Sequence, residues 1–116
     1  MPREWREIGL ASEIERTGRL IARVEGREIG VLRAGNQLHA IRNRCPHHGG
    51  PLCLGMIRER EGGTPGRYTQ SGLLVLRCPW HGWEFDLETG ACPDDPSLRV
   101  ATYDVRVVGE QVQILA

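Results

Sequence analysis

The chain has 116 residues, and its 15 basic and 15 acidic residues give a formal net charge of zero. A neutral chain has no global field that would attract nucleic acid or an anionic membrane, so its partners are expected to be protein surfaces. No apolar run in the sequence approaches the roughly 20 residues that a membrane-spanning helix needs. The length predicts one domain over residues 1–116.

An all-β fold is predicted by the 15 glycines and 7 prolines, together with short alternating runs of β-branched residues. We expect a first strand over residues 5–10, with Trp5 and Ile8 as packing residues. The segment Ser12–Glu15 has the spacing of a helix-capping pattern. Because Gly18 leaves room for only about one helical turn, we expect a corner between strands there.

Three further β-prone runs are separated by turns at Gly26 and Gly35, and they predict an antiparallel meander over residues 19–24, 27–33 and 37–42. His39 lies within the last run, where we expect a strand residue and not a metal ligand. The meander leads directly into a cysteine-containing loop, so that loop is expected to have a rigid scaffold behind it.

Two motifs each combine a thiol with an imidazole: CPHHGG at residues 45–50 and CPWHGW at residues 78–83. The candidate ligands are Cys45 and His47 in the first motif and Cys78 and His81 in the second. His48 directly follows His47 and could replace it as a ligand. Thiolate and imidazole both bind transition metals, so the two motifs indicate one metal centre held between two loops. The prolines fix φ after each cysteine, and the glycines allow close approach of the backbone.

The pattern Cys-x-His, a long gap and Cys-x-x-His resembles the Rieske family. The resemblance implies a [2Fe-2S] cluster with two cysteines on one iron, Cys45 and Cys78, and two histidines on the other, His47 and His81. The family spacing places the first imidazole ligand at His47 and leaves His48 with a structural or surface role. Neutral imidazoles in place of two thiolates remove negative charge from such a cluster, which raises its reduction potential.

The resemblance also implies a Rieske-type antiparallel β-sandwich with a small cluster-binding subdomain, formed by loops at about 43–55 and 76–86. The polar, glycine-rich segment 57–72 predicts an exposed hairpin or flap inserted between the loops, serving either partner recognition or no more than a mobile surface connection. An apolar strand at residues 73–77 is expected to return the chain to the second motif.

Residues 82–86 resemble the strand that closes the Rieske cluster subdomain, and we expect Trp83 and Phe85 to pack on one face beneath the loops. Residues 98–108 and 111–115 predict a last hairpin. Respiratory Rieske proteins have Ser and Tyr where this chain has Trp83 and Phe85. The lack of those hydroxyls predicts a potential toward the low end of the family's range.

Other interpretations of the cysteines stay open. Two cysteines and two histidines also suit a structural zinc ion, although zinc requires no proline after each cysteine. A secreted, disulfide-bonded domain is disfavoured because no hydrophobic signal segment precedes Trp5. Respiratory Rieske proteins join their cluster loops by a disulfide, but here Trp80 occupies one partner's position, so Cys53 is expected to be a small buried residue. A bond between Cys53 and Cys92 stays open, although a cytoplasmic location argues against it.

The function that the resemblance implies is that of a soluble, cytoplasmic ferredoxin, an electron carrier without catalytic residues of its own. Such ferredoxins pass single electrons from a flavin-dependent reductase to a terminal ring-hydroxylating oxygenase. One alternative is the Rieske-like small subunit of a NAD(P)H nitrite reductase or of another multicomponent oxidoreductase. A domain related to oxygenase α subunits is a further alternative, but 116 residues leave no room for their catalytic domain. Trp80 is expected in an exposed loop at the docking tip.

Overall fold

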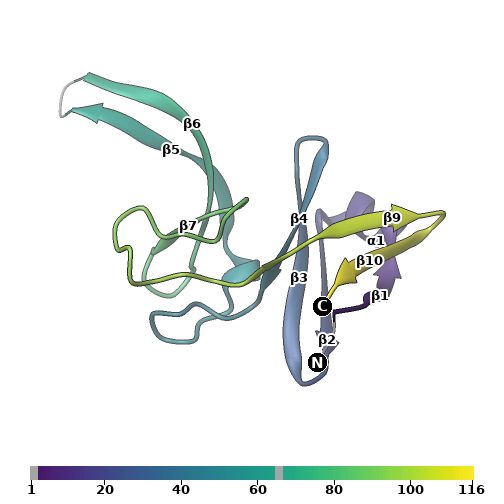
Figure 1. Cartoon of the computed structure of the whole chain (residues 1–116). Coiled ribbons are helices and arrows are strands. Elements are labelled where there is room, and N and C mark those ends of the chain that lie inside the picture. Colours follow the sequence, from purple (N-terminus) through teal and green to yellow (C-terminus); the bar gives the residue numbers. More distant parts are fainter. Residues whose placement is uncertain (1–2, 65–66) are drawn as a thin grey trace.

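The structure, a computed structural model, describes residues 3–64 and 67–116, and for residues 61–64 and 67–72 it describes the backbone alone. Antiparallel strands predominate in these residues, as the sequence predicts, and within the described ranges they form three sheets (Figure 1). The first sheet contains β1 (Trp5–Leu10), β10 (Gln111–Leu115) and β9 (Val105–Val108) in that order. The second contains β2 (Arg19–Val24), β3 (Arg27–Ala34), β4 (Gln37–Arg42) and β8 (Thr102–Tyr103). The third contains β5 (Met56–Thr64), β6 (Arg67–Arg77) and β7 (Glu84–Asp86).

The predicted meander is confirmed, because β2, β3 and β4 are consecutive antiparallel neighbours. The register pairs Val31 of β3 with Leu20 on one side and with Ala40 on the other, and all three side chains are buried. They share a core with Val112 and Ile114 of β10. This core joins the first sheet to the second, so the two sheets form the layered base of the molecule.

The segment after β1 differs from the sequence expectation, because it forms a complete helix, α1 (Ala11–Thr17), and not only a corner. Ser12 lies inside this helix, whereas the N-cap is Leu10, which makes no side-chain capping hydrogen bond. The helix forms because Ile14, which is 3 % exposed, packs into the core. Burial of an apolar face stabilises short helices that local propensity alone does not support. Gly18 ends the helix in the left-handed conformation, with φ of 85°.

The expectation of a packing role is wrong for Trp5, which is 38 % exposed. Its ring lies 3.9 Å from the guanidinium carbon of Arg106 on β9, as a cation–π pair. Ile8, by contrast, packs partly against the core as predicted. Among the described residues, no helix is long and apolar enough to cross a membrane.

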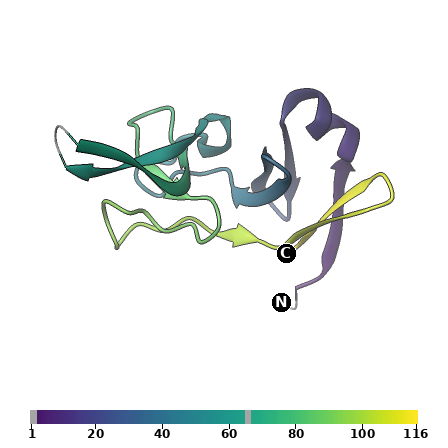
Figure 2. The same cartoon turned by 90° about the horizontal axis from the view of Figure 1, so that it is seen from above.

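The segment between the two motifs forms a long hairpin. Residues 57–72, expected as an exposed hairpin or flap, supply most of β5 and β6, and the tip at 65–66 lies outside the described residues. The predicted strand at 73–77 is the second half of β6. Figures 1 and 2 show this hairpin at one end of the molecule and β1, β9 and β10 at the other.

Ion pairs fix the base of the hairpin to β7 and to the loop that follows. Arg60 of β5 donates a hydrogen bond to Glu84 at 2.8 Å and another to Asp94 at 2.5 Å. The bond from Arg60 holds the pKa of Asp94 below its ordinary value. Arg58 places a second guanidinium 3.5 Å from Glu84. The base of the β5–β6 hairpin is therefore held in place against β7 and the loop that follows it.

A second core lies beneath the two motifs. Phe85 is fully buried in this core and Trp83 packs partly against it, as predicted. Cys53 is also buried here, and its sulfur lies only 2.5 Å from the position that a Cβ would occupy at Gly30. Burial raises the pKa of Cys53 to about 12. All four cysteines are free, so the bond between Cys53 and Cys92 that the sequence left open is not formed.

Candidate metal centre

The two motifs form loops with the same backbone hydrogen bonds. In the first loop, the N–H of Cys45 donates to the carbonyl of Gly50 at 2.8 Å, and the N–H of Gly49 donates to the carbonyl of Cys45 at 2.7 Å. The second loop repeats both bonds, from Cys78 to Trp83 at 2.8 Å and from Gly82 to Cys78 at 3.0 Å. Gly49 and Gly82 have φ of 78° and 77°, a conformation that favours glycine. Each cysteine is therefore held by a loop with the same backbone conformation.

The first loop is tied to the meander by Asn43, which directly follows β4. The side-chain oxygen of Asn43 accepts a hydrogen bond from the N–H of Cys53 at 2.8 Å, and its amide nitrogen donates to Glu28 of β3 at 2.9 Å. Cys53 belongs to a short 3-10 turn, Leu52–Leu54, just after the motif. The start and the end of the loop are thus fastened to each other and to the sheet.

The second loop connects β6 to β7, whose pairing closes it at its base through the register pair of Arg77 and Glu84. The guanidinium of Arg77 lies 2.9 Å from the position of a Cβ at Gly82, and that of Arg44 lies 3.5 Å from the same position at Gly49. Neither arginine was predicted from the sequence to belong to the site. The available signal was the triplet Arg-Cys-Pro that opens both motifs.

Cys45 and Cys78 come together at the buried end of the site, where both are 2 % exposed. Burial raises the pKa of the Cys45 thiol, and the neighbouring Cys78 acts in the same direction. A backbone hydrogen bond from His47 has the opposite effect on that pKa. A bound metal stabilises thiolates in such a place, because its positive charge compensates for their burial.

The imidazoles of His47, His48 and His81 form a second group, in which the candidate ligand nitrogens all lie within 4.8 Å of one another. His47 and His48 stack with ring centroids 3.9 Å apart, and His81 meets the His47 ring edge-on at 5.3 Å. Burial lowers the pKa of His47, and so do the neighbouring His48 and His81, which favours the neutral form that binds metals.

A buried nitrogen of His47 indicates where a ligand would bind. Its Nδ1 is buried and has no hydrogen-bond partner among the described residues. Buried polar atoms are normally satisfied, so an atom of this kind calls for a partner such as a metal ion. His48 is close enough to serve as well, and the choice of His47 stays a prediction. His39 lies within β4, opposite Leu32, as the sequence predicts.

The donors fit a cluster with two metal ions better than a single ion. Among the described side chains, neither cysteine sulfur falls within the group of imidazole nitrogens. A tetrahedral zinc ion needs all four donors around one point. In a [2Fe-2S] cluster of mixed ligation, by contrast, the thiolates and the imidazoles bind different irons. The separation of the thiols from the imidazoles therefore suits the cluster.

A family model for the Rieske-like [2Fe-2S] domain matches residues 4–115. The chain belongs to this family. The predicted resemblance is therefore confirmed, and membership implies a [2Fe-2S] cluster as the cofactor of this Rieske domain. Cys45, His47, Cys78 and His81 are the residues that we predict to hold it.

Two curated relatives illustrate the family. The human Rieske domain-containing protein is 32 % identical over 98 residues, which cover 79 % of this chain and 56 % of that protein. Apoptosis-inducing factor 3 of the mouse is 32 % identical over 87 residues, which cover 74 % of this chain and 12 % of that protein. The chain thus spans little more than half of one relative and a small part of the other.

Solved structures confirm the Rieske-type fold. The ferredoxin of carbazole 1,9a-dioxygenase from Nocardioides aromaticivorans is 25 % identical, with a TM-score of 0.72 and coverage of 98 % of this chain and 97 % of that chain. A putative NADH-dependent nitrite reductase small subunit from Mycobacterium tuberculosis is 20 % identical, with a TM-score of 0.80 and coverage of 98 % and 96 %. The second similarity shows the fold alone.

Proposed function

We propose that this Rieske domain is a ferredoxin, which accepts single electrons from a flavin-dependent reductase and passes them to a terminal ring-hydroxylating oxygenase. The observation that carries this proposal is the similarity to the ferredoxin of carbazole 1,9a-dioxygenase, which extends over 98 % of this chain and 97 % of that chain. Ferredoxin-type Rieske domains are electron carriers, so the finer part of the proposal concerns the two redox partners.

The site has a buried end, formed by the two cysteines, and an exposed end, formed by the imidazoles, and we propose a different role for each. The bound [2Fe-2S] cluster supplies the one-electron chemistry. In our proposal, the buried Cys45 and Cys78 exclude water from one iron. His47 and the exposed His81 would hold the other iron, at the surface end of the site. The imidazole end would therefore be the side that faces a redox partner, because His81 is exposed whereas Cys45 and Cys78 are buried.

The proposal includes a location and a mode of action. The protein acts as one domain over residues 1–116, without catalytic residues of its own, and it works in the cytoplasm. Cys53 and Cys92, which lie outside the predicted ligand set and form no disulfide, support that location, because a reducing compartment keeps thiols from pairing.

The test is electron transfer between purified components. The protein is assayed for iron and inorganic sulfide and then mixed with NADH, a flavin-dependent reductase and a Rieske oxygenase from the same organism. Bleaching of the cluster absorbance by the reductase, followed by its recovery when oxygenase and substrate are added, is the expected result. A cluster that the reductase leaves oxidised contradicts the carrier role. Stoichiometric zinc without sulfide contradicts the cofactor as well.

The same mixture separates a carrier from a permanent subunit. A ferredoxin binds its partners briefly and elutes alone in size-exclusion chromatography after turnover. A small subunit of a nitrite reductase or of another multicomponent oxidoreductase would instead elute in a stable complex. Such a complex would replace the ferredoxin proposal with the subunit alternative.

A further inference from the structure

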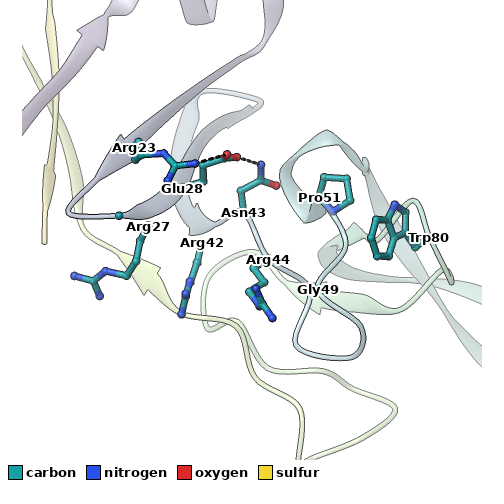
Figure 3. Close-up of a pocket in the computed structure, with 10 residues that line it drawn as sticks. Arg23, Arg27, Glu28, Arg42, Asn43, Arg44, Gly49, Pro51 and Trp80 are labelled. Atoms are coloured by element: carbon teal, nitrogen blue, oxygen red, sulfur yellow. Dashed lines mark hydrogen bonds and ion pairs between the residues drawn. The ribbon is translucent and has the colours of Figure 1, made fainter.

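A groove runs beside the first cluster loop, with a volume of about 420 Å³. One side comes from the hairpin that joins β2 to β3, where Arg23 and Arg27 lie. The floor comes from the end of β4 and the start of the first loop, with Arg42 and Arg44, and the indole of Trp80 from the second loop forms the far edge. Figure 3 shows these side chains, which come from separate elements of the chain.

The charge of this groove is strongly positive, although the chain as a whole is neutral. Among the described residues, Glu28 is the one acidic residue that lines the groove, and it already interacts with Arg23 at 3.5 Å and with the side chain of Asn43 at 2.9 Å. The other three arginines form no ion pair within the part of the chain that the structure describes; they are Arg27, Arg42 and Arg44. In Figure 3 they project to the same side of the groove.

The cations are all guanidinium groups, because the 15 basic residues of this chain are arginines and none is lysine. A guanidinium is planar and weakly hydrated, and it binds a carboxylate through two parallel hydrogen bonds. Unpaired arginines in a groove are therefore suited to bind carboxylates of another molecule.

The groove adjoins the proposed cluster. The guanidinium of Arg44 packs against Gly49 of the first loop. The ring of Trp80 lies 2.9 Å from the position of a Cβ at Gly50, and the sulfur of Cys78 lies 3.1 Å from the same position. A molecule bound in the groove would therefore lie close to the first cluster loop and to Cys78, one of the predicted ligands.

Apolar groups continue the surface on the far side of Trp80. A second groove, of about 610 Å³, is lined by Leu54, Met56 and Trp80 together with the second cluster loop. All three of these side chains are exposed, and Trp80 is 57 % exposed. Exposed apolar groups beside a charged area are typical of protein interfaces, whereas a nucleic acid backbone needs charge along its whole length.

We propose that the arginine groove is the electrostatic half of the docking surface, and that its occupant is a carboxylate-rich face of an electron-transfer protein. The proposal rests on the ferredoxin function proposed above. Carboxylates of the partner pair with Arg27, Arg42 and Arg44, and the apolar groups around Trp80 supply the other half of the contact. Complementary charges of this kind accelerate association and orient the partner toward the cluster.

The test uses a gold electrode coated with a carboxylate-terminated monolayer as a defined substitute for an acidic protein face. Adsorbed mass and the rate of interfacial electron transfer are measured for the wild type and for the double variant Arg27→Glu/Arg42→Glu. The matched control is Arg16→Glu/Arg33→Glu, which changes the net charge by the same amount, because both arginines are exposed and neither lines the groove. Should the double variant lose its cluster, Arg27→Gln/Arg42→Gln replaces it.

We expect the double variant to lose about tenfold in adsorption or in electron-transfer rate at low salt, and the control to match the wild type. An equal loss in the control would mean that only net charge matters, and an unchanged double variant would remove the groove from docking. Both results overturn the proposal. So would tight binding of a labelled oligonucleotide at physiological salt that is lost in the double variant. Adsorption does not require a redox-active cluster, so the groove is tested even if the ferredoxin function fails.

Discussion

The two cluster loops share a backbone and differ in the side chain that follows the proline. Residues 44–49 and 77–82 are identical except that the first has His47 where the second has Trp80. The same hydrogen bonds hold both loops, so the two cysteines occupy equivalent places. The predicted imidazole ligands do not occupy equivalent places, because His47 and His81 stand at different positions of the two loops. The shared backbone hydrogen bonds thus fix the position of the thiols. An imidazole ligand is predicted two residues after the cysteine in the first loop and three residues after it in the second.

Removing each histidine of the first loop in turn tests whether the two loops use different positions for their imidazole ligands. We expect His47→Ala to lose the cluster, because the buried Nδ1 of His47 has no hydrogen-bond partner among the described residues and is therefore available to a metal. His48→Ala is expected to keep the cluster, since His48 is exposed and stacks on the outside of His47. Iron, inorganic sulfide and the electron paramagnetic resonance spectrum of the reduced protein are measured for each variant.

The opposite pattern would make the two loops more alike than we propose. If His48→Ala loses the cluster and His47→Ala keeps it, then both imidazole ligands come from the position before the glycine. The loops would then be true repeats, and the ligand assignment would be wrong by one residue.

The next effect concerns Gly49 and Gly82, which directly follow His48 and His81. Both need positive φ, so Gly49→Ala and Gly82→Ala are each expected to destabilise the protein by about 1–2 kcal/mol. Gly82→Ala is expected to cost more, because its Cβ would lie 2.9 Å from the guanidinium of Arg77, whereas Arg44 stays at an ordinary 3.5 Å from Gly49. Thermal unfolding followed by cluster absorbance measures the difference.

Gly109→Ala is the matched control for the glycine pair. Gly109 also has positive φ, of 61°, but a Cβ there would meet nothing within 4 Å. Its variant therefore reports the backbone strain alone. Equal midpoints for all three variants would show that the arginines move aside freely and that the two loops are equally tolerant.

Much of the fold could be predicted from the sequence, because short alternating runs and glycine turns are local signals. The strand at 5–10 and the meander follow directly from them. Helix α1 could not be predicted, since it depends on burial of Ile14 against strands distant in the chain. The same reason accounts for the exposure of Trp5, whose ring pairs with Arg106.

The candidate site divides in the same way. The four predicted ligands lie in two short motifs, so the sequence alone indicates a metal centre. It does not indicate the arginine groove, because Arg27, Arg42 and Trp80 come from three elements that only the folded chain brings together. Local sequence therefore indicates what binds the cluster, whereas the topology determines what surrounds it.

Trp80 offers a smaller effect at the position where the loops differ. Replacing Trp80 by Ser is expected to weaken docking by about 1 kcal/mol, or about fivefold in affinity, because a large exposed aromatic residue commonly anchors an interface. The cluster spectrum is expected to stay nearly unchanged. Stopped-flow electron transfer to a cognate partner over a range of protein concentrations measures the effect.

Trp5→Ser is the control, since Trp5 is also partly exposed but lies on β1 in the first sheet. If both tryptophan variants transfer electrons at the wild-type rate, Trp80 serves only to cover Gly50 and the Cys78 sulfur. A loss in both would indicate a general change in the protein and not a docking role.

The smallest expected effect concerns the reduction potential and Phe85, which lies two positions beyond Trp83 and whose ring carries no hydroxyl. Respiratory Rieske proteins place hydroxyls at the positions of Trp83 and Phe85, where they donate hydrogen bonds to sulfur and stabilise the reduced cluster. Neither residue has a hydroxyl to donate, and Phe85 is fully buried in the same core as the two motif cysteines. We therefore expect a potential below zero, within a family range of about −150 to +300 mV.

Protein-film voltammetry of Phe85→Tyr tests this reasoning. The new hydroxyl lies in the buried core, where leaving a hydrogen-bond donor unsatisfied costs about 1–3 kcal/mol. A hydrogen bond from this hydroxyl to a cysteine sulfur is therefore favoured. A bond to that sulfur withdraws charge from the cluster, and the potential is expected to rise by tens of millivolts, with the sign set by stabilisation of the more negative, reduced form. Phe85→Leu removes the ring without adding a donor and should leave the potential near that of the wild type. If the wild-type potential lies well above zero, backbone amides such as those that bond Cys45 outweigh the missing hydroxyls, and the low-potential assignment fails.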